Sequence, residues 1–436
     1  MRKRIIITLI IGFTLFKSSL SQSLYFPPLS GAAVWETVSP TTLGWCLNEI
    51  DTLYNYLEQQ DTKGFIVLKN GKIVLEKYFG TFTQDSLWYW ASAGKTITAF
   101  LIGKAQEENY LSINDTSSTY LGPGWTSCTT SQENKIKIVN QLTMTSGLDD
   151  DVPDNHCTNS SCLNYLADAG TRWAYHNAPY TLLETVLTNA TGTNINTYTQ
   201  TKLKTKTGMT GAWAFVGYDN VFFSKVRSMA RFGLLIQNNC IWNNDTLLFD
   251  TSYINQMTNT SQNINLSYGY LWWLNGKPSY MLPTTQFVFP GSYAPAAPSD
   301  MFAGLGKNGQ ILSISKNSGI VFVRMGNQAS GGEVPNQLCN SIWEKLNAVM
   351  CNVTYEVELP LKSFKLNIYP NPAETELNLD IPMFGDFQIE ISNSLGQLII
   401  NEQNKSKIDI SNLTNGLYFV KFKQGANYFN QKFIKQ

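Results

Sequence analysis

Two residues with complementary chemistry, a serine and a lysine, lie three positions apart in the stretch WASAGKTITAF. They are Ser92 and Lys95. The stretch also contains Gly-Lys-Thr, but a phosphate-binding loop needs a glycine five residues before Gly94, and Tyr89 stands there. Apolar residues after Lys95 follow helical spacing, so both side chains are expected to project from one face at the start of a helix. Lys95 is thus placed to accept the Ser92 proton, and nucleotide binding is excluded.

A lysine base is the natural choice here because histidine bases are scarce. The chain has only two histidines, His156 and His176, and no G-x-S-x-G turn that would present a serine. A free lysine titrates near pH ~10.4 and accepts a proton at neutral pH only when it is desolvated or close to positive charge. Lys95 should therefore lie in a semi-buried cleft.

A tyrosine and an asparagine further along the chain could complete such a site. Tyr175 and Asn177 flank His176 in GTRWAYHNAPY, and alternation along an extended loop would place both on one side and His176 on the other. A phenol near Lys95 can relay the serine proton to a leaving group, and an amide can hold both lysine and substrate. His176 is then expected to be packed or exposed rather than catalytic.

The acidic segment DDDVPDNHC, residues 149–157, offers carboxylates, His156 and Cys157 close together. No spacing within it matches a known metal site, so a solvated loop is the expected structure.

The surrounding segments predict an α/β domain with a mainly antiparallel sheet. Residues 64–80, GFIVLKNGKIVLEKYFG, indicate two strands around an Asn-Gly turn. Residues 309–326, GQILSISKNSGIVFVRMG, indicate another strand–turn–strand, and helical patches lie between the two. From residue 364 onward, apolar and polar residues alternate between turns, which predicts a small all-β sandwich of roughly seventy residues.

The N-terminus predicts export. Residues 2–4 are basic and residues 5–16 are apolar, so residues 1–21 are expected to be a secretory signal peptide. No second apolar run of spanning length follows, and no transmembrane anchor is expected. The net charge of zero and the absence of a basic patch argue against a nucleic-acid partner.

Seven cysteines in an exported chain suggest disulfides with one cysteine left over. Cys157 and Cys162 are close enough to clip a small loop, and Cys339 and Cys351 could join the two ends of the helix-like stretch between them. The others have no obvious partner: Cys46, Cys128 and Cys240.

The order of these motifs resembles the serine β-lactamase-related hydrolases, in the branch of class C β-lactamases, D-alanyl-D-alanine carboxypeptidases and esterases. The resemblance rests on Ser92-x-x-Lys95, Tyr175-x-Asn177 and the later FAGLGKNGQ, supported by VNQLTMTSGLDDD, SMARFGLLI and YGYLWW, and covers roughly residues 50–350. It implies an α/β (α+β) penicillin-binding-protein-like domain, with an antiparallel sheet flanked by helices and a helical subdomain.

The resemblance also implies roles for individual residues. Ser92 would be the acylated nucleophile, with Lys95 as its base. Tyr175 would shuttle protons, and Asn177 would position the substrate. The oxyanion hole would combine the Ser92 N–H with one from the strand entered near the residues Gly306 and Lys307.

The third motif departs from the family pattern. Relatives carry Lys-Thr-Gly or His-x-Gly where this chain has Gly304-Leu305-Gly306. A cation that would hold a substrate carboxylate is missing there, which favours esters or neutral amides over penicillins and D-Ala-D-Ala.

The C-terminal segment has a resemblance of its own. YPNPAETELNL, NSLGQ, ISNLTNGLYFVKF and the final KFIKQ resemble the C-terminal sorting domain of the Bacteroidetes type IX secretion route. This implies a secreted or cell-surface protein that engages the type IX secretion machinery. The expected organisation is a signal peptide (1–21), a hydrolase domain (22–356), a linker (357–363) and a sorting domain (364–436).

The leading hypothesis is therefore a secreted serine hydrolase that cleaves a small-molecule or peptide-like ester or amide through a Ser92 acyl-enzyme, with no cofactor and no metal. One alternative is a penicillin-recognising carboxypeptidase or β-lactamase. The other is a non-catalytic surface binding protein on the same fold.

Overall fold

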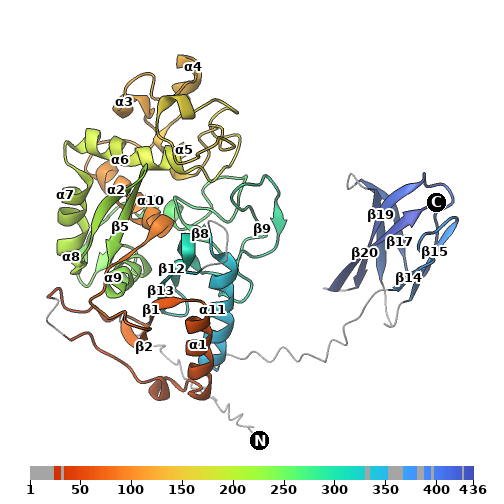
Figure 1. The fold of residues 1–436 in the computed structure, drawn as a ribbon, viewed down its shortest axis with the longest axis horizontal. Helices are drawn as coiled ribbons and strands as arrows, with labels where there is room; N and C mark the ends of the chain where they lie inside the picture. The colour runs from red at the N-terminus through yellow and green to blue at the C-terminus, as the bar shows by residue number, and fades with distance from the viewer. Residues whose placement is uncertain are drawn as a thin grey trace, which may run out of the picture. The chain divides into compact units, whose positions relative to one another are not determined.

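The computed structural model describes residues 24–30, 34–328, 334–351, 367–380, 387–393, 397–424 and 427–436. The chain forms two compact units, Met1–Val353 and Thr354–Gln436, each with a hydrophobic core of its own (Figure 1). The expected signal peptide and linker lie outside the described residues.

The first unit is built on a six-stranded antiparallel sheet with the strand order β2-β1-β13-β12-β11-β8. The expected Asn-Gly hairpin is confirmed: Asn70 (φ 49°) and Gly71 (φ 85°) turn the chain between the first two strands. The strands span Thr62–Lys69 (β1), Lys72–Tyr78 (β2), Trp273–Leu274 (β8), Phe302–Gly306 (β11), Gln310–Ser315 (β12) and Ile320–Gly326 (β13).

Helices cover both faces of this sheet. Val321 on β13 lies against Gly233 of α9 (Val226–Gln237), whereas the next residue, Phe322, packs its ring 5.4 Å from that of Trp343 on α11 (Asn336–Val349). Consecutive strand residues point to opposite faces, so α9 and α11 lie on opposite sides of the sheet. Helix α1 (Asn48–Gln59) packs beside α11 (Figure 1).

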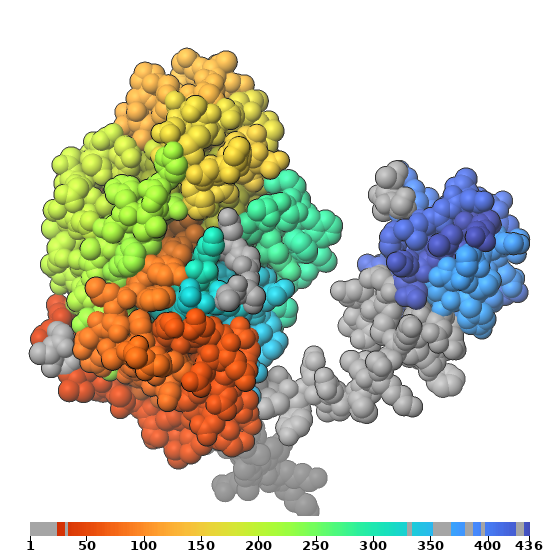
Figure 2. All heavy atoms as spheres, in the orientation of Figure 1, coloured from red at the N-terminus to blue at the C-terminus, as the bar shows by residue number. Residues whose placement is uncertain are grey.

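A helical subdomain forms one end of the unit, seen in orange and yellow in Figure 2. It has a small core of its own, and α6 packs against α2, the helix that follows Ser92. The helices involved are α2 (Lys95–Glu107), α3 (Ser118–Leu121), α4 (Thr130–Glu133), α5 (Ile138–Leu142) and α6 (Asn177–Thr191).

A three-stranded sheet, β3-β5-β4, lies beside the start of α2, and its strands are β3 (Trp88–Tyr89), β4 (Ala212–Val216) and β5 (Asp219–Ser224). Shorter elements complete the unit: α7 (Ile195–Thr199), α8 (Thr205–Thr207), α10 (Thr251–Met257), β6 (Ile241–Trp242), β7 (Asp245–Thr246), β9 (Ser279–Tyr280) and β10 (Phe289–Pro290).

The second unit consists of two antiparallel sheets around an apolar core, as the alternation of its sequence predicts. One sheet has the order β14-β15-β18 and the other β17-β16-β19-β20. The strands are β14 (Asn367–Tyr369), β15 (Glu376–Asp380), β16 (Gln388–Asn393), β17 (Leu398–Gln403), β18 (Lys407–Asp409), β19 (Gly416–Gln424) and β20 (Asn427–Lys435).

The disulfides correct one prediction and confirm another. Cys157 and Cys162 form the expected loop clip. The expected pairing of Cys339 with Cys351 is wrong, because Cys351 is bonded to Cys46 and Cys339 is free and buried. Helix α11 rises 1.5 Å per residue and holds positions twelve apart at about 18 Å, far beyond the Cα separation that a disulfide spans.

Candidate active site

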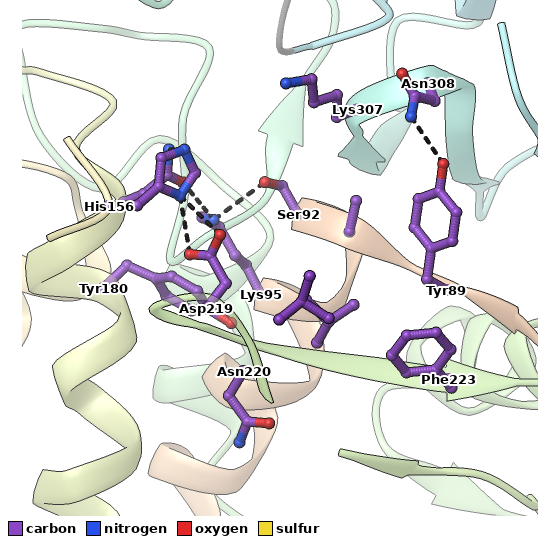
Figure 3. Close-up of a pocket in the computed structure, with 14 residues that line it drawn as sticks. Tyr89, Ser92, Lys95, His156, Tyr180, Asp219, Asn220, Phe223, Lys307 and Asn308 are labelled. Atoms are coloured by element: carbon purple, nitrogen blue, oxygen red, sulfur yellow. Dashed lines mark hydrogen bonds and ion pairs between the residues drawn. The ribbon is translucent and has the colours of Figure 1, made fainter. Parts of the chain in front are cut away.

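Ser92 lies in a tight turn, η2 (Ala91–Gly94), that leads directly into α2. Ala91 adopts a φ of 45°, a left-handed conformation that is costly for a residue with a side chain. The turn is anchored by the buried Trp90, whose indole Nε1 donates to Ser224 Oγ at 2.8 Å. The sharp change in backbone direction at Ala91 lets the Ser92 hydroxyl face an open pocket (Figure 3).

The amine of Lys95 lies between a serine and an amide. Its Nζ donates to Ser92 Oγ at 3.1 Å and to Asn177 Oδ1 at 2.8 Å, and the residue is only 3% exposed. The amine also lies 4.0 Å from the ring centroid of Tyr180 and 5.3 Å from that of Tyr175. The structure thus brings together three of the residues that the sequence suggested, in a site largely removed from solvent.

Tyr175 and His176 lie behind this pair rather than in the pocket. Tyr175 is buried and stacks on Trp273, with ring centroids 5.6 Å apart, and its ring faces the Lys95 amine. His176 is also buried, neither ring nitrogen has a hydrogen-bond partner among the residues that the structure describes, and burial lowers its pKa to about 4. The His176 imidazole is therefore neutral at physiological pH and does not line the pocket.

Strand β11 lies against the turn η2 through its glycines. A β-carbon on Gly306 would lie 2.4 Å from Trp90 O and 3.0 Å from Ser92 N, so only glycine allows this approach. A β-carbon on Gly304 would lie 2.9 Å from Thr96 Cγ2, one turn further along α2, which leaves no room there for a lysine side chain.

The residue after β11, Lys307, lines the pocket in a short turn, η5 (Lys307–Gly309). The buried guanidinium of Arg324 fixes this turn, donating through Nη1 to Asn308 O and Gly309 O, each at 2.8 Å. The Asn308 side chain donates through Nδ2 to Tyr89 Oη, also at 2.8 Å. The backbone beside Ser92 is therefore held from both sides.

The pocket has a volume of about 280 Å³. Its walls come from strand β3, the turn η2, the start of α2, the loop before α6, α6 itself, the β4–β5 hairpin and the turn η5. The lining residues are Tyr89, Ala91, Ser92, Lys95, His156, Asn177, Tyr180, Val216, Asp219, Asn220, Val221, Phe223, Lys307 and Asn308. The hairpin contributes three apolar side chains, those of Val216, Val221 and Phe223, and the polar side chains of Asp219 and Asn220.

Two polar residues that line the pocket were not predicted as site residues: His156 was expected in a solvated loop, and Asp219 was not singled out. His156 does not lie in a fully solvated loop, because it lines the pocket with its Nδ1 at 2.7 Å from Asp219 Oδ2 (Figure 3). Burial raises the pKa of Asp219, but the hydrogen bond from His156 and the charge of Lys95 outweigh it and hold that pKa below its usual value. The two residues are 63 positions apart, so no local pattern marks them.

The family model described as Beta-lactamase matches residues 53–338, about two thirds of the chain. The chain belongs to the beta-lactamase family. The expected fold, an antiparallel sheet flanked by helices, is confirmed. A comparison with curated protein sequences finds no match.

Solved structures share the beta-lactamase-family fold at low identity. The protein named "Putative 6-aminohexanoate-dimer hydrolase from Bacillus anthracis" has 17% identity and a TM-score of 0.55, covering 72% of this chain and 87% of its own. A penicillin-binding protein homolog from Caulobacter crescentus has 12% identity and a TM-score of 0.54, covering 70% of this chain and 99% of its own. At such identities the likeness establishes the fold alone.

The secretion system C-terminal sorting domain matches residues 367–436, which confirms the second resemblance. This beta-lactamase-family protein is thus secreted or displayed at the cell surface, and its sorting domain implies interaction with the type IX secretion machinery. Within the described residues, no helix has the length and apolar character needed to cross a membrane. Over the same residues, no group of three or more acidic, histidine or cysteine side chains is placed to hold a metal ion.

Proposed function

We propose that this protein is a secreted serine hydrolase that cleaves an ester or a neutral amide through an acyl-enzyme on Ser92. The observation that carries the proposal is the placement of the Lys95 amine, 3.1 Å from Ser92 Oγ and 2.8 Å from Asn177 Oδ1, at the floor of an open pocket. A binding protein gains nothing from a nucleophile aligned with a base.

In the proposed acylation, Ser92 Oγ attacks the substrate carbonyl carbon and its proton passes to Lys95 Nζ. For this step the Lys95 amine must be in its neutral form, in which it can accept the proton while it still donates to Asn177. The protonated Lys95 amine, which lines the pocket, then gives this proton to the departing alcohol or amine. Tyr175 does not line the pocket, and its ring, 5.3 Å from the amine, helps to position Lys95. Water then attacks the acyl-enzyme carbonyl, which releases the acid and restores the Ser92 hydroxyl.

The negative charge on the carbonyl oxygen needs fixed donors. The Ser92 N–H lies at the start of α2, where unpaired N–H groups favour negative charge. Because Gly306 approaches the turn so closely, we assign the second donor to the N–H of the next residue, Lys307. Two backbone donors held by rigid elements are the arrangement that stabilises an oxyanion.

The shape of the pocket favours a substrate with an apolar acyl group. One wall is formed by apolar residues of the hairpin, Val216, Val221 and Phe223. A cavity of about 280 Å³ suits a small acyl chain better than a large one. Gly304, where the family carries a cation, offers no charge for a substrate carboxylate.

The test is intact-protein mass spectrometry of the full chain after separate incubation with p-nitrophenyl butyrate, a penicillin and a fluorophosphonate. Ser92→Ala is the matched control. We expect a fluorophosphonate adduct and butyrate turnover that both vanish in the variant. A folded wild type that gains no adduct from any of the three would refute the hydrolase and favour the non-catalytic surface binding protein.

A penicillin-recognising carboxypeptidase or β-lactamase is the second candidate, because one observation favours it. The Lys307 side chain lines the pocket and could hold a substrate carboxylate in place of the missing cation. A charged hydrogen bond of about 1.5–3 kcal/mol corresponds to roughly 10-fold to 100-fold in rate. On this view Lys307→Met should reduce penicillin acylation by that factor and leave butyrate turnover much less affected; equal effects would reject it.

A further inference from the structure

A continuous chain of polar contacts leads from the pocket wall to Ser92, and Figure 3 labels four of its members, Asp219, His156, Lys95 and Ser92. Asp219 pairs with His156 Nδ1 at 2.7 Å, and His156 Nε2 lies 3.3 Å from Asn177 Nδ2. Asn177 Oδ1 then accepts from Lys95 Nζ at 2.8 Å, and Lys95 contacts Ser92 Oγ at 3.1 Å. These contacts link β5, the loop before α6, α6 itself and the start of α2.

The chemistry of the two end groups fixes every proton between them. An ionised carboxylate only accepts hydrogen bonds, so the nitrogen of His156 that faces Asp219, Nδ1, carries a hydrogen. At the other end a lysine amine donates, so Asn177 must turn its carbonyl oxygen towards Lys95. The amide nitrogen of Asn177 then faces His156, whose Nε2 has to be the unprotonated acceptor.

The second amide hydrogen of Asn177 has an acceptor as well. Asn177 Nδ2 donates to Asn155 Oδ1 at 3.3 Å. Asn155 is itself held in place because its backbone carbonyl oxygen accepts from the backbone N–H of Ala178 at 2.9 Å. With both amide hydrogens bound and the oxygen on Lys95, only one of the two orientations of the Asn177 amide satisfies its neighbours.

We propose that His156 and Asp219 are positioning residues that set the orientation of the Asn177 amide, and through it the place of the Lys95 amine beside Ser92. The inference rests on the proposed Ser92 hydrolase. Asp219 holds His156 in the Nδ1–H tautomer, and the bare Nε2 accepts from Asn177. If this acceptor is lost, one amide hydrogen of Asn177 loses its partner, and only the 3.3 Å contact with Asn155 still holds the amide nitrogen on that side. Rotation by 180°, which presents the NH2 group to Lys95 so that two donors oppose each other, then becomes less costly.

A stabilising surface ion pair is a poorer explanation of the His156–Asp219 contact. The two side chains are 38% and 30% exposed, and pairs at such exposure contribute little to stability. Their replacement should therefore affect the rate of Ser92 acylation more than the stability of the fold.

Two substitutions of His156 separate its contacts. In His156→Gln the side-chain amide reaches the position of Nε2 and can accept from Asn177, whereas in His156→Asn it reaches only the position of Nδ1, next to Asp219. We expect the second-order rate of fluorophosphonate labelling at Ser92 to fall about 10-fold to 100-fold in His156→Asn, since a misplacement of about 1 Å costs on the order of 100-fold. His156→Gln should stay within about 5-fold of the wild type, and melting temperatures should change little in both. Equal rates in all three folded proteins would overturn the proposal.

A second measurement does not depend on catalysis. The chain has two histidines, so the histidine region of a 15N–1H correlation spectrum of the full chain contains two side chains, and His156→Gln assigns one by its disappearance. We expect His156 as the Nδ1–H tautomer at neutral pH, shifting towards the other tautomer in Asp219→Asn. If the spectrum instead shows His156 with a hydrogen on Nε2, or on both ring nitrogens, the proposal that His156 positions Asn177 is overturned. Absence of labelling in the wild type would instead reject the hydrolase.

Discussion

Gly306→Ala should uncouple the oxyanion hole from the nucleophile while keeping the fold. The added β-carbon would lie 2.4 Å from Trp90 O, 2.9 Å from Ala93 N and 3.0 Å from Ser92 N. Non-bonded heavy atoms settle at about 3.5 Å, so β11 and the turn must separate by about 1 Å. The backbone at Gly306 is extended (φ −135°, ψ 152°), which alanine adopts freely, so the effect arises from the contact alone.

A misplacement of about 1 Å costs on the order of 100-fold in rate, and the loss of an oxyanion donor costs about 100-fold to 1,000-fold. We therefore expect kcat/KM of Gly306→Ala to fall by about 100-fold to 1,000-fold. Overpacking of this kind costs about 1–3 kcal/mol in the free energy of unfolding. The assay is kcat/KM for p-nitrophenyl butyrate, with stability from urea unfolding.

Gly304→Ala is the matched control on the same strand. Its β-carbon would lie 2.9 Å from Thr96 Cγ2 and 3.3 Å from Ala93 O of the turn, a milder clash than the one at Gly306, so activity should fall less than about 10-fold. If Gly306→Ala retains wild-type kcat/KM, or if both variants lose activity equally, the assignment of this strand to the oxyanion hole is refuted.

Two further predictions concern stability. Burial lowers the pKa of His176 to about 4, below the ~6.5 of the unfolded chain, so the unfolded state binds the proton first and stability falls by about 3 kcal/mol between pH 7 and pH 4. In His176→Leu, the free energy of unfolding measured in urea should no longer show this part of its fall at acid pH. If the wild type and the variant lose the same free energy of unfolding between pH 7 and pH 4, the prediction is contradicted. Replacing Cys46 and Cys351 together by alanine should lower stability by about 2–5 kcal/mol, because that bond joins residues 305 positions apart. Replacing Cys157 and Cys162, which are 5 positions apart, should lower the stability less. If this variant loses more stability than the Cys46/Cys351 variant, the length of the closed loop does not explain the contribution of the disulfides.

What the sequence reveals about the site depends on how far apart the contacting residues are. Ser92 and Lys95 are three positions apart at the start of a helix, so helical geometry alone predicts their contact. Asn177 contacts Lys95 across 82 positions, so its chemistry and the family resemblance pointed to it, but no local geometry could predict the contact. The hairpin β1–β2 was predictable for the same reason as the serine and lysine, because its turn is local.

Contacts set by tertiary packing were predicted wrongly or missed. Proximity in sequence suggested Cys339 for Cys351, but helix α11 holds them apart and the bond goes to Cys46 instead. The Asp219–His156 pair depends on a hairpin folding back over a loop 63 positions earlier, and neither residue lies in a recognisable motif.

The loop that carries His156 shows why a charge-rich segment can be misread. Its aspartates suggest a solvated surface, but charge density describes the average residue of a segment and not the one that is anchored. Asn155 is held by the N–H of Ala178, and Cys157 is bonded to Cys162, so the residue between them is fixed on both sides. A histidine held in this way, with a carboxylate on one ring nitrogen and an amide on the other, can keep a single tautomer. That property depends on neighbours from three separate segments, which is why it becomes visible only in the folded chain.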